Sequence, residues 1–155
     1  MEFLDGKEVI ELEKILIPHL VREEGFVSHA YEDSMGYLTI GVGRMIDKAK
    51  GGGITHSEAE FLLQNDVDRV TNALWKRIPW IKSLDTVRQA VLASMAFQLG
   101  VDGFLDFKHT LKMVQAERWG QAADGMLASL WADQTSERAE RLAKAMETGE
   151  AKWLT

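Results

Sequence analysis

The chain has 155 residues, no cysteine, two prolines and a formal net charge of −6. This length predicts one domain, and the missing cysteines exclude disulfide bonds and thiolate metal sites. The acidic balance argues against a nucleic-acid binder, which needs a basic face, and no apolar run approaches the ~20 residues of a membrane span.

The first predicted element is a helix over residues 8–22, where apolar side chains recur every three or four positions. Pro18 inside this stretch predicts a kink or two shorter helices, and Gly25 predicts its end. We expect residues 1–13 to form an N-terminal extension that lengthens this helix or packs on the larger lobe.

Alternation with a period of two follows the helix and is typical of a strand. Leu38, Ile40 and Val42 alternate with polar or small residues, among them Thr39. The apolar set is expected to face the core, and Thr39 a cleft. Residues 32–36 are typical of a turn, so a hairpin, with or without a third short strand, is predicted.

Helices fill the remainder of the predicted chain. Gly51 to Gly53 predict a flexible connection, and Thr55 to Glu58 resemble a capping box. A long helix over 56–77 could bridge two lobes, and a helix over 84–99 is apolar nearly all round, which is typical of a central, buried helix. Shorter helices are predicted over 107–116, 119–131 and 135–147.

The expected fold class is therefore α+β and mainly helical, in a single domain spanning 1–155. A small lobe, about 24–60, holds a β-hairpin or a short three-stranded sheet. The helix over 56–77 joins it to a helical lobe over 80–155.

Three residues could carry glycoside chemistry. Glu24 lies where the first helix ends, Asp33 lies in the turn and Thr39 lies on the following strand. Two carboxylates on different elements can flank a glycosidic bond, one acting as acid while the other orients water. Alone, each has a simpler interpretation: a solvated glutamate, an aspartate capping its own turn, and a threonine chosen for strand propensity.

The joint pattern Glu-Gly-x5-Tyr-x-Asp-x2-Gly-x2-Thr-Ile-Gly-x-Gly, which begins at Glu24, favours the catalytic interpretation. This pattern resembles that of the phage-type lysozymes. Among these, it is most similar to the lysozymes of T-even bacteriophages. The resemblance covers roughly residues 14–153, through segments such as 97–100, 131–135 and 138–141. It implies the phage lysozyme fold.

The resemblance also implies a muramidase that cleaves the β-1,4 bond between N-acetylmuramic acid and N-acetylglucosamine in peptidoglycan, inverting the anomeric centre. Glu24 would be the general acid, and Asp33 and Thr39 would hold the attacking water, with the two carboxylates about 6.5–9.5 Å apart. No metal or cofactor is needed for this chemistry.

Further residues match the family's cleft. Arg138 matches the arginine that pairs with the catalytic glutamate, and Phe97 and Gln98 match positions on the cleft floor, with Trp131 behind them. Gln134 is also expected to line the cleft. A buried Gln98 needs a hydrogen-bond partner, for which we expect the indole of Trp131.

The chain departs from the family at three points. Arg44 stands where the family has a histidine, which there pairs with the aspartate corresponding to Asp66, so we expect a bidentate Arg44–Asp66 ion pair. The segment 44–55 is shorter than in the T-even enzymes. Those enzymes are strongly basic, whereas this chain is acidic, which predicts weaker steering toward an anionic wall.

The expected biological role is that of a phage or prophage endolysin. The start of the chain lacks the basic region and apolar stretch of a signal peptide. The protein is therefore expected to accumulate as a monomer in the bacterial cytoplasm and to reach the wall after a holin lesion, without stable membrane association. The alternatives are a non-enzymatic peptidoglycan-binding or scaffold domain that kept the fold, and the lytic module of a bacteriocin or secreted effector.

Overall fold

The computed structural model describes the backbone of residues 6–155 and the side chains from Ile10 onward. The chain divides into two compact units, Met1–Ala59 and Glu60–Thr155. We call them the N-terminal lobe and the helical lobe. The mainly helical α+β class is confirmed. Of the expected N-terminal extension, residues 1–5 lie outside the described part.

The N-terminal lobe begins with α1, Gly6–Glu24, which is one continuous helix with Pro18 inside it. The predicted alternative of two shorter helices is wrong. Proline fixes φ near the helical value, so a single lost hydrogen bond need not break a helix of this length. Gly25 then takes a left-handed φ of 72°, and its N–H donates to the carbonyl of Val21 at 2.9 Å, which ends the helix as predicted.

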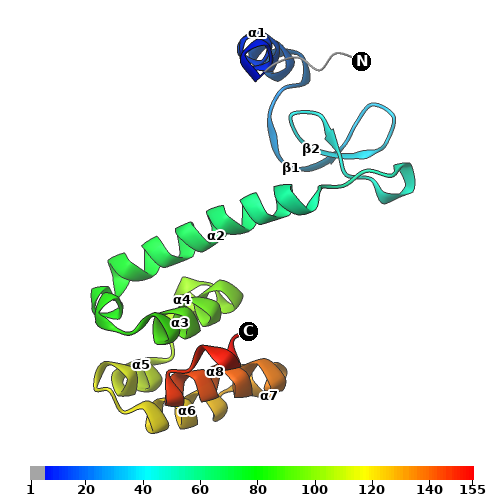
Figure 1. Cartoon of the computed structure of the whole chain (residues 1–155). Coiled ribbons are helices and arrows are strands. Elements are labelled where there is room, and N and C mark those ends of the chain that lie inside the picture. The colour runs from blue at the N-terminus through cyan, green and yellow to red at the C-terminus, as the bar shows by residue number, and fades with distance from the viewer. Residues whose placement is uncertain (1–5) are drawn as a thin grey trace. The chain divides into compact units, whose positions relative to one another are not determined.

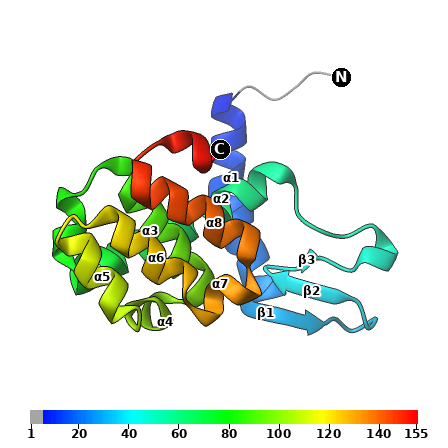
Figure 2. The ribbon, with the colours of Figure 1, turned by 90° about the horizontal axis from the view of Figure 1, so that it is seen from below.

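A three-stranded antiparallel sheet follows, with the strands in the order β1 (Val27–Glu32), β2 (Leu38–Gly41) and β3 (Arg44–Met45) (Figure 2). The predicted hairpin and its third short strand are both present. In the register, Thr39 of β2 lies opposite Tyr31 on one side and Met45 on the other. The central strand therefore holds Thr39 between two large side chains.

The connection after β3 is hydrogen-bonded through the N–H groups of Gly51, Gly52 and Gly53, whereas a flexible connection was predicted for these glycines. Asp47 accepts a hydrogen bond from the N–H of Ala49 and begins the 3-10 helix η1, Lys48–Lys50. The N–H of Gly52 donates to the carbonyl of Asp47 at 2.8 Å. A β-carbon on Gly52 would lie 2.8 Å from the carbonyl oxygen of Met45, so this glycine permits close packing of the backbone.

The long helix α2, His56–Arg77, has the bounds expected for it. Its first turn belongs to the N-terminal lobe and the remainder to the helical lobe. The other elements of the helical lobe are η2 (Pro79–Ser83), α3 (Thr86–Leu99), α4 (Val101–Leu105), α5 (Lys108–Gln115), α6 (Trp119–Leu127), α7 (Leu130–Gln134), α8 (Ser136–Thr148) and η3 (Ala151–Trp153).

Two details of the helical lobe differ from the expectation. The short helix α4 was not predicted, and the stretch 119–131 is divided between α6 and α7. The division occurs because the hydroxyl of Ser129 accepts from the N–H of Ala132 and caps a new helix there. None of the described helices combines the length and apolar character needed to cross a membrane.

The hydrophobic core of the described chain lies in the helical lobe; its buried apolar residues run in the sequence from Leu74 to Met146. Helix α3 contributes Val91, Leu92 and Met95, each fully buried, which confirms the predicted central helix. Helix α8 packs on α3, α6 and α7, and α6 also packs on α5 (Figure 1). This packed bundle gives the side chains of α3 and α7 a rigid support.

Candidate active site

Glu24 is the last residue of α1, and its carboxylate lies against the turn between β2 and β3. A β-carbon built on Gly43 would stand 2.9 Å from Oε2 of Glu24 and 3.0 Å from its carboxyl carbon. Gly43 also has a left-handed φ of 66°. Only glycine both adopts this backbone without strain and leaves room for the carboxylate. The conformation of the turn therefore sets the surroundings of Glu24.

Asp33 stabilises the turn between β1 and β2. Its Oδ1 accepts hydrogen bonds from the N–H groups of Met35 at 2.8 Å and Tyr37 at 2.9 Å. The simpler interpretation, a local cap, is therefore correct for this oxygen. Within the described chain, no hydrogen bond involves Oδ2, so a half-buried carboxylate oxygen with a fixed direction is left for another partner.

Thr39 is only 4% exposed, whereas Leu38 is 44% and Val42 is 38% exposed. The expectation that the apolar residues of this strand face a core is therefore wrong for Leu38 and Val42. The flanking strands β1 and β3 enclose the middle of β2. The hydroxyl of Thr39 donates to the carbonyl of Tyr37 at 3.1 Å, and its lone pairs can still accept.

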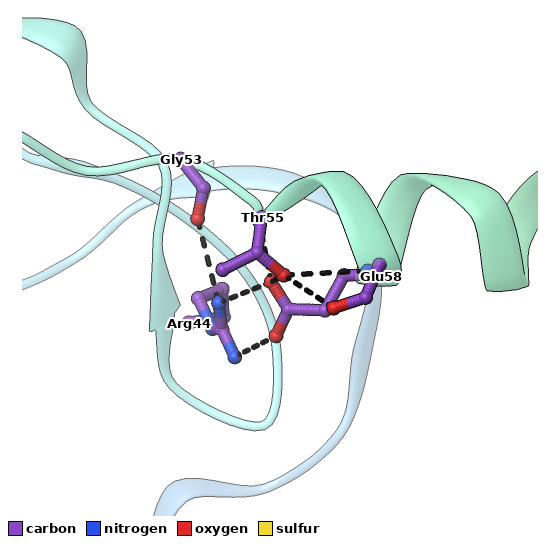
Figure 3. A network of polar contacts seen from close by, with 5 residues as sticks. Arg44, Gly53, Thr55 and Glu58 are labelled. Carbon is purple, nitrogen blue, oxygen red and sulfur yellow. Dashed lines mark hydrogen bonds and ion pairs between the residues drawn. The ribbon is translucent and has the colours of Figure 1, made fainter.

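The expected Arg44–Asp66 ion pair is wrong. Arg44 instead binds Glu58 with both terminal nitrogens, and Nη1 lies 3.0 Å from Oε2 (Figure 3). Asp66 pairs with Arg69 on its own helix at 2.6 Å. The physical reason is proximity, because Glu58 is in the first turn of α2, beside β3, while Asp66 is two turns further along.

Glu58 also completes the predicted capping box, which is confirmed. Its Oε2 accepts from the N–H of Thr55 at 2.7 Å, while its own N–H donates to Oγ1 of Thr55 at 3.3 Å. The hydrogen bonds from Arg44, together with those from Thr55, lower the pKa of Glu58 to about 2. Glu58 is therefore ionised at neutral and mildly acidic pH.

Gln98 and Trp131 form the expected contact in the helical lobe. Nε1 of Trp131 donates to Oε1 of Gln98 at 2.9 Å, and Phe107 meets the indole edge-on, with ring centroids 6.2 Å apart. Trp131 is 4% exposed, so this hydrogen bond satisfies a buried donor. The pair fixes the direction of the Gln98 amide.

Gln134 lines a cavity of about 550 Å³ on the helical lobe, together with Trp131, Thr110 and Gly125. Thr110 is 4% exposed, and a β-carbon on Gly125 would stand 2.7 Å from its hydroxyl oxygen. The sequence analysis did not predict that Thr110 lines a cavity. The feature that could have indicated this is the position of Thr110, a hydroxyl residue, on the buried face of the helix predicted over 107–116.

Phe97 and Arg138 line a second cavity of about 440 Å³, which is otherwise mostly apolar. Nη2 of Arg138 donates to the carbonyl and the hydroxyl of Ser94, at 3.1 and 2.9 Å. Glu24 and Arg138 belong to different lobes, and their pairing stays a prediction. Among the described residues, no group of three acidic or histidine side chains is placed to hold a metal ion.

The N-terminal lobe holds a small sheet, an acid at the end of a helix, an aspartate in a turn and a threonine on a strand. Together with a helical lobe, these are the parts of a two-lobed glycosidase of the lysozyme class. The family model described as phage lysozyme matches residues 21–146. The chain belongs to the phage lysozyme family and is a glycoside hydrolase.

Named relatives agree with this membership. The chain is 31% identical to "Probable T4-type lysozyme 1" of Dictyostelium discoideum, over 82% of this chain and 90% of that protein. It is 34% identical to "Endolysin" of Salmonella phage P22, over 74% and 79% respectively. It is 29% identical to "Peptidoglycan hydrolase gp36" of Pseudomonas phage phiKMV, over 82% of this chain but 14% of that protein, so similar domains also occur within longer chains.

Proposed function

We propose that the protein is an endo-acting muramidase that hydrolyses the β-1,4 bond between N-acetylmuramic acid and N-acetylglucosamine in peptidoglycan, with inversion at the anomeric carbon. The observation that carries this proposal is the arrangement of the N-terminal lobe. The carboxylate of Glu24 lies against the turn that ends the strand of Thr39, and Asp33 orients one free oxygen from the neighbouring turn.

Each residue has a distinct role in the proposed reaction. Glu24 protonates the leaving glycosidic oxygen as general acid. Asp33, through the oxygen that does not cap its turn, accepts a proton from water, while Thr39 accepts a second hydrogen bond from the same water. Inversion requires this water on the opposite face of the sugar, so the two carboxylates should lie about 6.5–9.5 Å apart.

The helical lobe supplies the remaining contacts in this proposal. Gln98, oriented by Trp131, binds an amide or hydroxyl group of the glycan, and Gln134 does so from the wall of the neighbouring cavity. Phe97 offers an apolar surface to a sugar ring. Arg138, whose guanidinium donates to Ser94, is the family arginine expected to pair with the catalytic glutamate.

The proposed biological role is lysis of a bacterial host by a phage. A relative of similar length is named an endolysin, and another relative is named a peptidoglycan hydrolase. In this role the protein acts as a monomer, waits in the cytoplasm, and reaches the wall after a holin opens the membrane.

A turbidity assay on outer-membrane-permeabilised Gram-negative cells tests the proposal. Wild-type protein should clear the suspension, and Glu24→Gln should abolish clearing while circular dichroism stays unchanged. Glu23→Gln is the matched control, because it removes the adjacent carboxylate and should retain clearing. A Glu24→Gln variant as active as Glu23→Gln would refute the assignment. A folded wild type that binds peptidoglycan without clearing cells would favour the binding or scaffold domain.

A further inference from the structure

The turn from Gly41 to Arg44 is held at both of its ends. Backbone pairing of Ile40 with Arg44 closes the turn from the sheet side. Gly41 and Gly43 both have left-handed φ values, 69° and 66°. Two such glycines allow many conformations in an isolated turn, so a further contact is needed to select one.

The side chain of Arg44 supplies that contact. It binds Glu58 with both terminal nitrogens, and Nη1 also approaches the carbonyl of Gly53 at 3.5 Å (Figure 3). A bidentate guanidinium–carboxylate pair restrains direction as well as distance. Arg44 therefore joins the end of the turn to the start of α2.

Glu58 is itself fixed in place. Its Oε2 accepts from both the N–H and the hydroxyl of Thr55, at 2.7 and 3.0 Å. The carboxylate thus receives donors from the cap of α2 and from β3. Because the helix cap holds the carboxylate of Glu58 in place, this carboxylate can restrain the side chain of Arg44.

We propose that Arg44 is a positioning residue for the general acid, and that its ion pair with Glu58 holds Gly43 against the carboxylate of Glu24. This proposal rests on the proposed function of Glu24. The path runs through three contacts: Glu58 to Arg44, Arg44 to Gly43 along the chain, and Gly43 to the Glu24 carboxylate.

The exposure of the pair separates its positioning role from a role in folding. The side chains of Arg44 and Glu58 are 48% and 37% exposed. An ion pair with this exposure contributes little to the free energy of unfolding. Misplacing a reacting group by ~1 Å, however, can cost up to about 100-fold in rate. The loss should therefore appear in kcat rather than in stability.

Three variants test the inference in the full chain. Glu58→Gln keeps a side chain that can complete the capping box but removes the charge that binds Arg44. Arg44→Met removes the cation, and Arg44→Lys returns a cation without the bidentate fork. Asp66→Asn is the matched control, because it breaks another exposed arginine–carboxylate pair, with Arg69, on the same helix.

With soluble peptidoglycan fragments as substrate, Arg44→Met and Glu58→Gln should lower kcat about tenfold and change KM by less than about twofold. Arg44→Lys should recover part of kcat, and Asp66→Asn should match the wild type. Amide hydrogen exchange in β3, whose residues pair with β2 at the end of this turn, should become faster in Arg44→Met and Glu58→Gln but not in Asp66→Asn.

A kcat within about twofold of wild type in Arg44→Met and Glu58→Gln would overturn the inference, as would an equal loss in Asp66→Asn or unchanged amide exchange in β3. A wild type without activity would refute the proposed function instead. In that case the amide exchange in β3 would still decide whether the ion pair holds the turn.

Discussion

Arg88 joins the beginning of α3 to the end of α8 in the helical lobe. Its Nε donates to the carbonyl of Met146 at 2.7 Å, and its Nη2 donates to the carbonyl of Glu147 at 2.9 Å. The last carbonyls of a helix have no partner within the helix. Arg88 supplies two of these partners, places a cation at the negative end of the helix, and stacks on Trp119 at 4.0 Å from the ring centroid.

Replacing Arg88 by methionine keeps an apolar stem and removes every one of these contacts. A hydrogen bond from a charged donor contributes about 1.5–3 kcal/mol, and a cation–π contact about 0.5–2 kcal/mol. The side chain is only 12% exposed, so water can replace these contacts only in part. Since such terms are not additive, we expect a loss of about 3 kcal/mol, which lowers Tm by roughly 6–12 °C.

Tryptophan fluorescence in urea measures this loss directly, because all five tryptophans lie within residues 60–155. The control is Arg69→Met, which breaks an exposed pair with Asp66 and should cost about 0.5 kcal/mol or less. If Arg88→Met were destabilised no more than Arg69→Met, the reasoning that Arg88 anchors the end of α8 would be refuted.

Three further outcomes are expected. Gly149→Ala should cost about 1–3 kcal/mol by urea denaturation, since Gly149 has a φ of 71° and its β-carbon would stand 2.8 Å from Nη1 of Arg88; Gly120→Ala, in open space, should not destabilise. Gln98→Met should cost about 1–3 kcal/mol, because the buried indole N–H of Trp131 loses its acceptor; a neutral result would contradict this account. Because the pKa of Glu58 is lowered from 4.5 to about 2, the Arg44 contact stabilises the folded state above about pH 5 and is lost as the pH falls toward 2. The difference in amide exchange at β3 between wild type and Glu58→Gln should therefore shrink as the pH falls from about 5 to 2, and a constant difference over this range would refute the assignment.

Local rules in the sequence predicted those parts of the fold that depend on neighbouring residues. The apolar character of 84–99 predicted the buried helix α3, and the spacing of Thr55 and Glu58 predicted the cap of α2. The Gln98–Trp131 hydrogen bond was predicted on the expectation of a buried Gln98; the hydrogen bond is present, but Gln98 is exposed and Trp131 is the buried partner. The family resemblance is confirmed over residues 21–146; the residue roles it implies, which composition cannot give, stay predictions.

The features that were not predicted depend on which side chains and strands meet in three dimensions, and residue spacing does not reveal this. Arg44 was expected to keep the partner of the family histidine, yet it binds Glu58 in the first turn of α2. The burial of Thr39 follows from pairing on both sides of β2, which alternation alone cannot predict. Pro18 lies inside one helix because a single missing hydrogen bond costs less than breaking the whole element.

The most direct test of the central claim, that Glu24 drives hydrolysis between muramic acid and glucosamine, is product analysis. Peptidoglycan is digested with wild type or with Glu24→Gln, and the new ends are labelled by reduction and identified by mass spectrometry. We predict N-acetylmuramic acid at the new reducing ends with wild type, and none with Glu24→Gln. Reducing-end N-acetylglucosamine, or an anhydro product of a lytic transglycosylase, would contradict the account.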